Sequence, residues 1–292
     1  MTIFNLGSIN ADLFYALPHM PSPGETIAAA SLERGLGGKG ANMSVAAARA
    51  ASRVVHMGAV GANGGWAVER LLEYGVDTRH IVQVEADTGH AIILVDQAGE
   101  NTIIIHHGAN HAIPEDLLGR ALSESETGDT LLFQNETLLQ PEAAAMARKL
   151  GMRVAYAAAP FDAEAARALL PLTDLLVLNE IEMEQLKSAS GQDLREMAVP
   201  TVIVTEGAAG GRLHRVETGW EAERFSSPEV KAVDTTGAGD TFTGYLVAGL
   251  DRGMPLRQAV ALASQAAALM VTRHGTADVI PDLRDVQDAR FG

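Results

Sequence analysis

A glycine-rich turn followed by an acidic residue is the most informative chemical feature of the sequence. The stretch "VDTTGAGDTFTG", residues 233–244, places Gly237, Ala238 and Gly239 directly before Asp240, where a helix-like pattern begins. Backbone amides at a helix start bind anions, and a carboxylate beside them is able to take a proton from a hydroxyl group. This combination is typical of phosphoryl transfer to an alcohol, although a glycine turn with an aspartate cap is also common in ordinary loops. The stretch also predicts that the helix dipole and the amides keep Asp240 ionised.

A second glycine-rich stretch, "GLGGKGAN" at residues 35–42, contains Gly-Lys but is not a P-loop. Glycine follows the lysine in place of the Ser or Thr that would meet Mg²⁺, and no strand pattern precedes it. Upstream, "GSINADLF" has two polar residues at alternate positions, which we expect at the end of the first strand and on one side of it. Together the two stretches offer donors and acceptors that suit a polyhydroxylated ligand: Asn10, Asp12, Lys39 and Asn42. Gly37 and Gly38 allow a small ligand to approach closely.

The elements that must position these residues alternate along the chain. Short β-branched runs predict buried strands at 53–61, 130–134, 152–157, 174–179 and 201–207. Alanine-rich segments between them predict helices at 41–52, 66–74, 142–150, 163–169 and 180–186. This order indicates right-handed β-α-β crossovers and an α/β fold in which helices cover both faces of a mostly parallel sheet.

Two segments, at about 12–35 and 89–108, break this alternation with extended patterns, and "DQAGEN" resembles a hairpin turn. We expect them to form a small β-sheet lid within a single domain of residues 1–292. The face of such a lid that does not cover a ligand needs a partner, so the sequence predicts a homodimer formed through the lid. The alternating apolar residues that suggest this are Ile92, Leu94, Ile103 and Ile105.

Composition excludes several classes of protein. The chain has 292 residues, 47% of them hydrophobic, with 37 acidic and 22 basic residues and a net charge of −15. This charge repels polyanions, so we expect no nucleic-acid partner. No cysteine is present, which excludes disulfides and thiolate sites. Because no apolar run approaches the roughly 20 residues of a membrane span, we expect a cytoplasmic protein with no membrane partner.

In order and wording, the motifs resemble the ribokinase family of sugar and nucleoside kinases, also called the phosphofructokinase B superfamily. The resemblance extends over nearly the whole chain, from "GSINAD" through "GGKGAN", "LLFQNE" and "LNEIEMEQL" to "VDTTGAGDTFTG" and "VTRHGTA". It implies a three-layer α/β/α domain with a β-sheet lid, ATP and a small sugar as substrates, Mg²⁺ with ATP, and activation by K⁺.

The resemblance also implies roles for individual residues. Asp240 matches the catalytic base, and Gly237, Ala238 and Gly239 match the anion hole. The family's sugar-contacting positions correspond to Asn10, Asp12, Gly38, Lys39, Asn42 and Glu136. Its nucleotide-binding positions correspond to Asn179, Glu182, Thr205, Gly207 and Gly210, with Glu182 ordering Mg²⁺ through water. The monovalent-cation positions correspond to Asp234, Thr236, Met270, Arg273 and Gly275.

The chain departs from the family pattern at four places. Ala62 and Asn63 stand where an acidic pair is frequent, and "AAAP" at 157–160 replaces a stretch resembling "NPAP". The segment between Gly191 and Thr201 is short, so a helix usual in the family is expected to be trimmed or absent. Val279 replaces a serine near the cation positions. These changes affect the expected substrate more than the expected reaction.

Three functions remain open on the sequence alone. The first is a sugar kinase, with ribose as the leading substrate. The second is a nucleoside or sugar-acid kinase of the same fold, in which Phe14 and Tyr15 would stack on a base. The third is a non-catalytic sugar or nucleotide sensor. A dinucleotide-dependent dehydrogenase is disfavoured because no G-x-G-x-x-G follows the first strand. The histidines of "HHGANH" lack the spacing of a zinc site.

Overall fold

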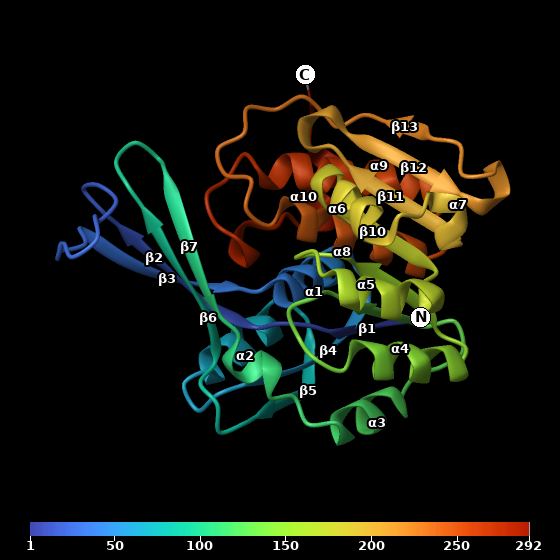
Figure 1. The fold of residues 1–292 in the computed structure, drawn as a ribbon, viewed down its shortest axis with the longest axis horizontal. Coiled ribbons are helices and arrows are strands. Elements are labelled where there is room, and N and C mark those ends of the chain that lie inside the picture. Colours follow the sequence, from blue (N-terminus) through green and yellow to red (C-terminus); the bar gives the residue numbers. More distant parts are fainter. Residues whose placement is uncertain (292) are drawn as a thin grey trace.

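The protein is described here by a computed structural model that covers residues 1–291. A nine-stranded sheet crosses the body in the order β13-β12-β11-β10-β9-β8-β1-β4-β5 (Figure 1). From β11 to β5 neighbouring strands are parallel, whereas β12 and β13 are antiparallel additions at one edge. The strands are β1 (Thr2–Leu6), β4 (Arg53–Val60), β5 (Asp77–Gln83), β8 (Thr130–Phe133), β9 (Arg153–Ala157), β10 (Leu175–Asn179), β11 (Thr201–Thr205), β12 (Gly211–Arg215) and β13 (Glu223–Phe225).

Helices cover both faces of this sheet because successive strand residues point to opposite sides. In β8, Leu132 belongs to one apolar core, while Leu131 and Phe133 belong to the other. The first core is closed by α1 (Lys39–Arg49), α2 (Gly65–Glu73), α8 (Ala238–Asp251), α9 (Leu256–Met270) and α10 (Leu283–Asp288). The second is closed by α3 (Asp116–Leu122), α4 (Gln140–Lys149), α5 (Ala163–Leu169), α6 (Glu180–Ser190) and α7 (Leu194–Met197).

The predicted elements of the body are confirmed. All five predicted strands are present as β4, β8, β9, β10 and β11, and all five predicted helices as α1, α2, α4, α5 and α6. Helix α1 begins at Lys39, two residues before the predicted start at 41. The short segment after Gly191 retains one helical turn, α7, which Asp193 and Glu196 close with a capping box. Within residues 1–291, no helix has the length and apolarity needed to cross a membrane.

A second sheet of four strands, in the order β3-β2-β6-β7, projects from the body (Figure 1). Its strands are β2 (Asn10–Ala16), β3 (Ser31–Gly37), β6 (Gly89–Val95) and β7 (Asn101–His106), with the hairpin turn at 96–100 where it was predicted. The register pairs Ile92 with Ile104 and Ile93 with Ile103, so both faces of the sheet are apolar. Ile92 and Leu94 therefore lie on one face of the small sheet, and Ile103 and Ile105 lie on the other.

The position of Asn10 and Asp12 also differs from the prediction. The first strand ends at Leu6, and both residues lie at the start of β2 in the small sheet. The chain passes from the body to the small sheet between Leu6 and Asn10. In this segment, Ser8 accepts hydrogen bonds from the amides of Gly40 and Ala41 in α1. The expected alternation is retained, since both side chains are buried on the same face of β2.

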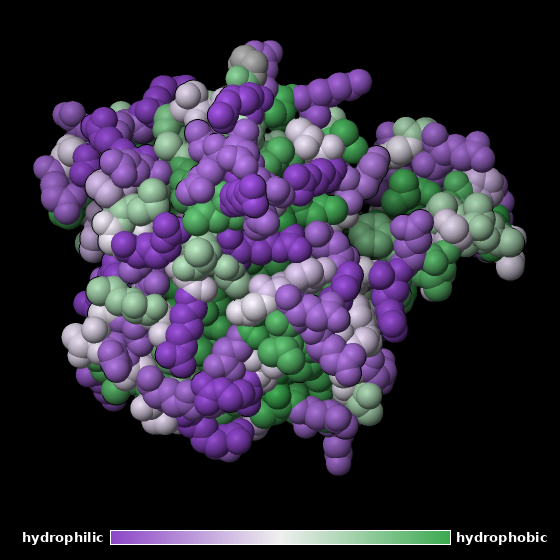
Figure 2. Space-filling model, turned by 180° about the vertical axis from the view of Figure 1, so that it is seen from behind, coloured by the Kyte–Doolittle hydropathy of each residue, from purple (hydrophilic) through white to green (hydrophobic). Residues whose placement is uncertain are grey.

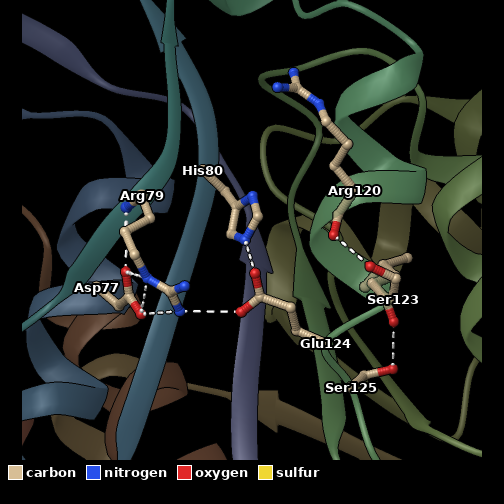
Figure 3. Close-up of polar contacts among 8 residues, drawn as sticks. Asp77, Arg79, His80, Arg120, Ser123, Glu124 and Ser125 are labelled. Carbon is tan, nitrogen blue, oxygen red and sulfur yellow. Dashed lines mark hydrogen bonds and ion pairs between the residues drawn. The ribbon is translucent and has the colours of Figure 1, made fainter.

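At β5, one of the two edge strands of the body sheet, a charge cluster lies between the strand and the segment that follows α3 (Figure 3). Arg79 donates to both carboxylate oxygens of Asp77 and, at 3.0 Å, to Glu124. The Nε2 of His80 lies 3.0 Å from the other oxygen of Glu124. Charged side chains at an edge strand oppose pairing with another chain, so we assign this cluster a structural role.

Candidate active site

Helix α8 begins with the residues predicted to form an anion hole. Gly237 precedes the helix with φ of 77°, a left-handed conformation that glycine adopts without steric cost. Ala238 and Gly239 are the first helical residues, and the amide of Ala238 is already used by the Thr235 carbonyl at 3.2 Å. The amides of Gly239 and Asp240 face the helix start without an intrahelical acceptor, so they are the groups that can bind an anion.

The Asp240 side chain lies in the first turn of α8 and is 8% exposed. Burial is the largest influence on its pKa and raises it, while the charge of Lys39 and a hydrogen bond from Asn42 lower it. Burial therefore opposes the ionisation of this carboxyl group, whereas the sequence led us to expect that the helix start keeps it ionised. A raised pKa brings a carboxylate closer to the range of an effective general base.

Close packing of α1 on α8 brings Asn42 to Asp240 across 198 residues of sequence. A Cβ atom on Gly244 of α8 would lie 2.5 Å from the Cβ of Ala46 and 2.6 Å from the Met43 carbonyl oxygen, so only glycine permits this approach. At the helix starts, the Asn42 Nδ2 donates to Asp240 Oδ2 at 2.9 Å. The "GGKGAN" and "TGAGD" motifs thus meet in one site.

The start of α1 is held against the turn that follows β1. Gly40 lies so close to Gly7 that a Cβ on Gly40 would be 2.3 Å from the Gly7 Cα. Gly38, with φ of 91°, caps the helix. Glu136, which follows β8, accepts hydrogen bonds from the Ser8 hydroxyl and from the Lys39 amide at 3.0 Å. Gly38, Lys39 and Glu136 therefore lie together where the start of α1 meets the segment after β8, a region that we call the polar corner.

Four charged groups meet at this corner. The Lys39 ammonium lies 3.9 Å from a carboxylate oxygen of Glu136. The charge of Asp240 is the main cause that raises the pKa of Lys39, so this lysine remains protonated. Burial raises the pKa of Asp12 to about 7, and the charges of Glu136 and Asp240 add to this effect. Asp12 lies over Gly37, where a Cβ would be 2.0 Å from its carboxylate.

One buried acceptor in this site has no protein partner. The Oδ1 of Asn42 is buried and makes no hydrogen bond to any group of residues 1–291. An unpartnered buried amide oxygen costs free energy, about 1–3 kcal/mol, unless a ligand or water donates to it. Because Nδ2 of the same amide is used by Asp240, the free oxygen is fixed in orientation and suits a ligand hydroxyl.

A cavity of about 580 Å³ lies on the other side of the α8 start. Phe225 and Phe242 give it an apolar wall that suits a purine ring. Its lining includes the predicted nucleotide residues of the loop after β11 and the anion hole: Thr205, Gly207, Gly210, Ala238 and Gly239. A larger hollow of about 860 Å³ runs along α6, but it is open and contains none of the predicted site residues, so we do not assign it a role.

Asn179 and Glu182 form a capping box at the start of α6. The Asn179 Oδ1 accepts from the Glu182 amide, and one Glu182 oxygen accepts from the Asn179 amide, both at 2.8 Å. Glu182 is also close enough to Lys39 and Asp240 for their charges to affect its pKa, which burial raises. The cap uses the Asn179 Oδ1 and one Glu182 oxygen, so the Asn179 Nδ2 and the second Glu182 oxygen take no part in it.

The predicted cation positions are brought together only in part. Asp234 accepts hydrogen bonds from the amides of Thr236 at 2.9 Å and Gly275 at 3.2 Å. Met270 is buried against Gly237, where a Cβ would lie 2.9 Å from its methyl group. The Arg273 guanidinium instead points to Asp285 and the Val279 carbonyl, so Arg273 offers this site only its backbone. Within residues 1–291, no group of three His, Asp or Glu side chains is arranged to hold a metal.

Sequence reasoning missed several residues that support the site. Ser8 links Glu136 to the start of α1, and Asn110 is buried against Asn10. Asn135 donates to the Pro160 carbonyl at 2.9 Å and accepts from Tyr156, so it supplies an amide beside the "AAAP" stretch that lacks one. No local pattern marks these residues, because their partners lie 20 or more positions away in sequence.

The histidines of "HHGANH" take part in two ring pairs. His106 lies beside His90 of the neighbouring strand, with ring centroids 5.1 Å apart. His107 stacks on His111 at 4.0 Å. The two adjacent histidines thus have different partners, as expected for neighbouring residues that face opposite ways.

Comparison with known proteins assigns this architecture to a family. Residues 2–283 match the pfkB family carbohydrate kinase description, which covers nearly all of the chain. This chain belongs to the pfkB family of carbohydrate kinases. It is 34% identical over 295 residues to a ribokinase of Haemophilus influenzae, a match that covers 96% of this chain and 95% of that protein.

Solved structures of the pfkB family agree with the fold. Ribokinase from Thermotoga maritima matches with a TM-score of 0.88 and 32% identity, covering 98% of each chain. Arabidopsis thaliana ribokinase complexed with ribose and ATP matches with a TM-score of 0.84 and 28% identity, covering 98% of this chain and 97% of that one. These likenesses confirm the predicted family, the layered α/β fold and the sugar phosphotransferase class.

Proposed function

We propose that this pfkB carbohydrate kinase transfers the γ-phosphate of ATP to the primary hydroxyl of ribose, giving ribose 5-phosphate and ADP. The observation that carries the proposal is the position of Asp240. Its carboxylate is bonded to Asn42 on the side of the buried polar corner, and the residue before it, Gly239, lines the adjacent cavity. An acceptor hydroxyl and a phosphate chain are therefore able to meet at one carboxylate.

Asp240 acts as the general base in this proposal. It takes the proton of the sugar hydroxyl while that oxygen attacks the γ-phosphorus, and the bond to ADP breaks. The amides at the α8 start donate to the oxygens of the transferring group. Lys39 remains protonated beside Asp240 and offsets the negative charge that accumulates there. Because the corner is buried, these interactions are stronger than they would be in water.

The sugar would bind at the polar corner by complementary hydrogen bonds. The unpartnered Asn42 Oδ1 accepts from a sugar hydroxyl, and Asp12 and Glu136 offer carboxylate oxygens. Lys39 and the Asn10 amide offer donors. A ligand with several adjacent hydroxyl groups satisfies these groups together, which supports a sugar over a less polar alcohol. The ribose assignment rests further on the ribokinases that this chain resembles.

The nucleotide would occupy the cavity beside α8, with its base against Phe225 and Phe242. Mg²⁺ fits the free groups of the capping box, because one Glu182 oxygen remains outside the cap and a hydrated Mg²⁺ needs few direct ligands. When bound, the ion would neutralise phosphate charge. Glu182 and Asn179 would hold it through water.

We also propose activation by K⁺. Asp234 stands near the anion hole, and its carboxylate is oriented by two backbone amides. Carbonyls of Thr236, Met270, Arg273 and Gly275 would complete an oxygen site. Turnover is expected to rise when K⁺ replaces Li⁺ at constant ionic strength, and Asp234→Asn is expected to weaken that response. Equal turnover in both salts would contradict the proposal.

The small sheet is proposed as a lid, built by residues 12–35 and 89–108, that covers the sugar and pairs two chains into a homodimer. Figure 2 shows apolar surface on this projecting sheet, and Leu32, Ile103, Ile104 and Ile105 are between 49% and 55% exposed. We expect Ile104→Asp to shift a dimer to monomer in sedimentation velocity. Ile181→Asp, at an apolar site on α6 that is 67% exposed, should leave the mass unchanged. A wild-type monomer at micromolar concentration would reject the dimer.

The deciding experiment measures ADP release with ATP, Mg²⁺ and a panel of acceptors: ribose, fructose, 2-keto-3-deoxygluconate, adenosine and pseudouridine. We expect the highest kcat/KM with ribose. We also expect the protein to act in the cytoplasm, where ATP is available. Preference for a nucleoside would favour the second function, and Phe14, on the same face of β2 as Asp12, would be the stacking residue. Sugar binding without ADP release would indicate a sensor.

A further inference from the structure

We infer that Asn110 is a positioning residue that fixes the orientation of the Asn10 amide, so that Asn10 offers the sugar hydrogen-bond donors and not an acceptor. The inference rests on the proposed function in taking the ligand to be a sugar. Asn110 itself lies behind Asn10, and its side chain is used by two protein groups.

Asn110 is located where the chain passes between the body and the small sheet. It belongs to a short 3₁₀ helix, Gly108–His111, that follows β7, and its side chain is 1% exposed. Gly89, the first residue of β6, packs against it. A Cβ on Gly89 would be 2.2 Å from the Asn110 Nδ2 and 2.5 Å from the Asn10 Oδ1. No water-sized gap separates the two amides, so their contact is direct.

The polarity of this contact follows from the backbone. The amide of Ile9 is a donor only, and it donates to the Asn110 Oδ1 at 2.9 Å. The Nδ2 of Asn110 must then face Asn10, where it donates to Oδ1 at 2.7 Å. The Asn10 oxygen is thereby used, and its Nδ2 is left for a ligand. The ambiguity that usually attaches to asparagine orientation is removed here by the fixed Ile9 donor.

A donor at Asn10 complements its neighbour in the strand. Asp12 lies two residues further along β2 on the same face and offers carboxylate acceptors. Asn10 thus presents a donor and Asp12 an acceptor to adjacent sugar hydroxyl groups. A hydroxyl group both donates and accepts, so one is able to accept from Asn10 while its neighbour donates to Asp12. Reversing the Asn10 amide would set two acceptors side by side. Asn110 thus determines the hydrogen-bond pattern that β2 offers to the sugar.

Asn110→Asp tests this relay. An aspartate still accepts from Ile9 but cannot donate, so the Asn10 amide must rotate and turn its oxygen to the sugar. We expect the dissociation constant and the KM for ribose to rise about tenfold or more, while kcat and the KM for ATP change by less than about twofold. Asn101→Asp is the control for the added charge, because Asn101 is exposed at the start of β7 in the same small sheet and belongs to none of the proposed binding residues.

A double-mutant cycle separates positioning from general destabilisation. In an Asn10→Ala background, Asn110→Asp should cause no further loss of sugar affinity, because the group that it reorients is gone. If Asn110→Asp fails to fold, Asn110→Ala serves in the same cycle. Equal effects in both backgrounds, or wild-type ribose affinity in the single variant, would overturn the inference. Calorimetric binding of ribose needs no turnover, so failure of the kinase proposal is distinguished from failure of this one.

Discussion

Asp240→Asn is the sharpest test of the active site. The substitution removes the proton acceptor but keeps size and shape. The amide oxygen of the new asparagine is still able to accept from the Asn42 Nδ2, which lies 2.9 Å from Asp240 Oδ2. Burial raises the pKa of the native carboxyl, so replacing it by a neutral group also removes a desolvation cost. The variant loses the charge that Asp240 offers to Lys39, but Glu136 still lies 3.9 Å from that ammonium, so we expect the variant to fold.

The kinetic loss follows from the role of the group. A positioned general base contributes about 10²- to 10⁴-fold to rate, which corresponds to about 3–5 kcal/mol of activation free energy. Since the sugar also contacts several other groups, its KM should change by less than about tenfold. The expected result is a fall in kcat of about two to four orders of magnitude with ribose affinity largely retained.

Asp251→Asn provides the matched control in the same helix. Asp251 is 7% exposed and burial raises its pKa as well, but it ends α8 far from the site. Coupled ADP-release kinetics and calorimetry of ribose binding should give near wild-type values for this variant. A kcat for Asp240→Asn within about tenfold of wild type would refute the base assignment.

Three further outcomes are expected. Gly244→Ala should lower the free energy of unfolding by about 1–3 kcal/mol in urea titrations, because the new Cβ would lie 2.5 Å from the Ala46 Cβ. Gly119→Ala is the control: its Cβ would meet nothing within 4 Å, so the free energy of unfolding should rise by up to about 1 kcal/mol. Ribose affinity should increase from pH 6 to pH 8 as Asp12, with its pKa raised to about 7, ionises and becomes a better acceptor, and Asp12→Asn should abolish the trend. Burial lowers the pKa of His56 from 6.5 to about 4, so between these pH values the unfolded chain binds a proton that the folded protein does not. The free energy of unfolding should therefore fall by about 1.4 kcal/mol for each unit by which the pH drops from 6.5 to 4. A smaller slope in His56→Asn would support this, and an unchanged slope would contradict it.

The sequence alone predicted the layered fold because its signals are local. The β-branched runs at 53–61 and 201–207 and the alanine-rich segments between strands carry the periodicity of β4, β11 and the covering helices. The glycines before Asp240 likewise marked a helix start by backbone requirements that need no distant partner. The family resemblance then supplied the roles of residues that local patterns left open.

Only the tertiary structure decided how those parts meet. The first strand ends at Leu6, so Asn10 and Asp12 belong to a separate sheet. The absence of a side chain on Gly244 allows α1 and α8 to touch, which joins residues 198 positions apart at Asp240. Asn110, inconspicuous in sequence, orients Asn10 across 100 positions. Such contacts depend on which surfaces face each other after folding, and hydrophobic periodicity within a segment carries no information about its distant partner.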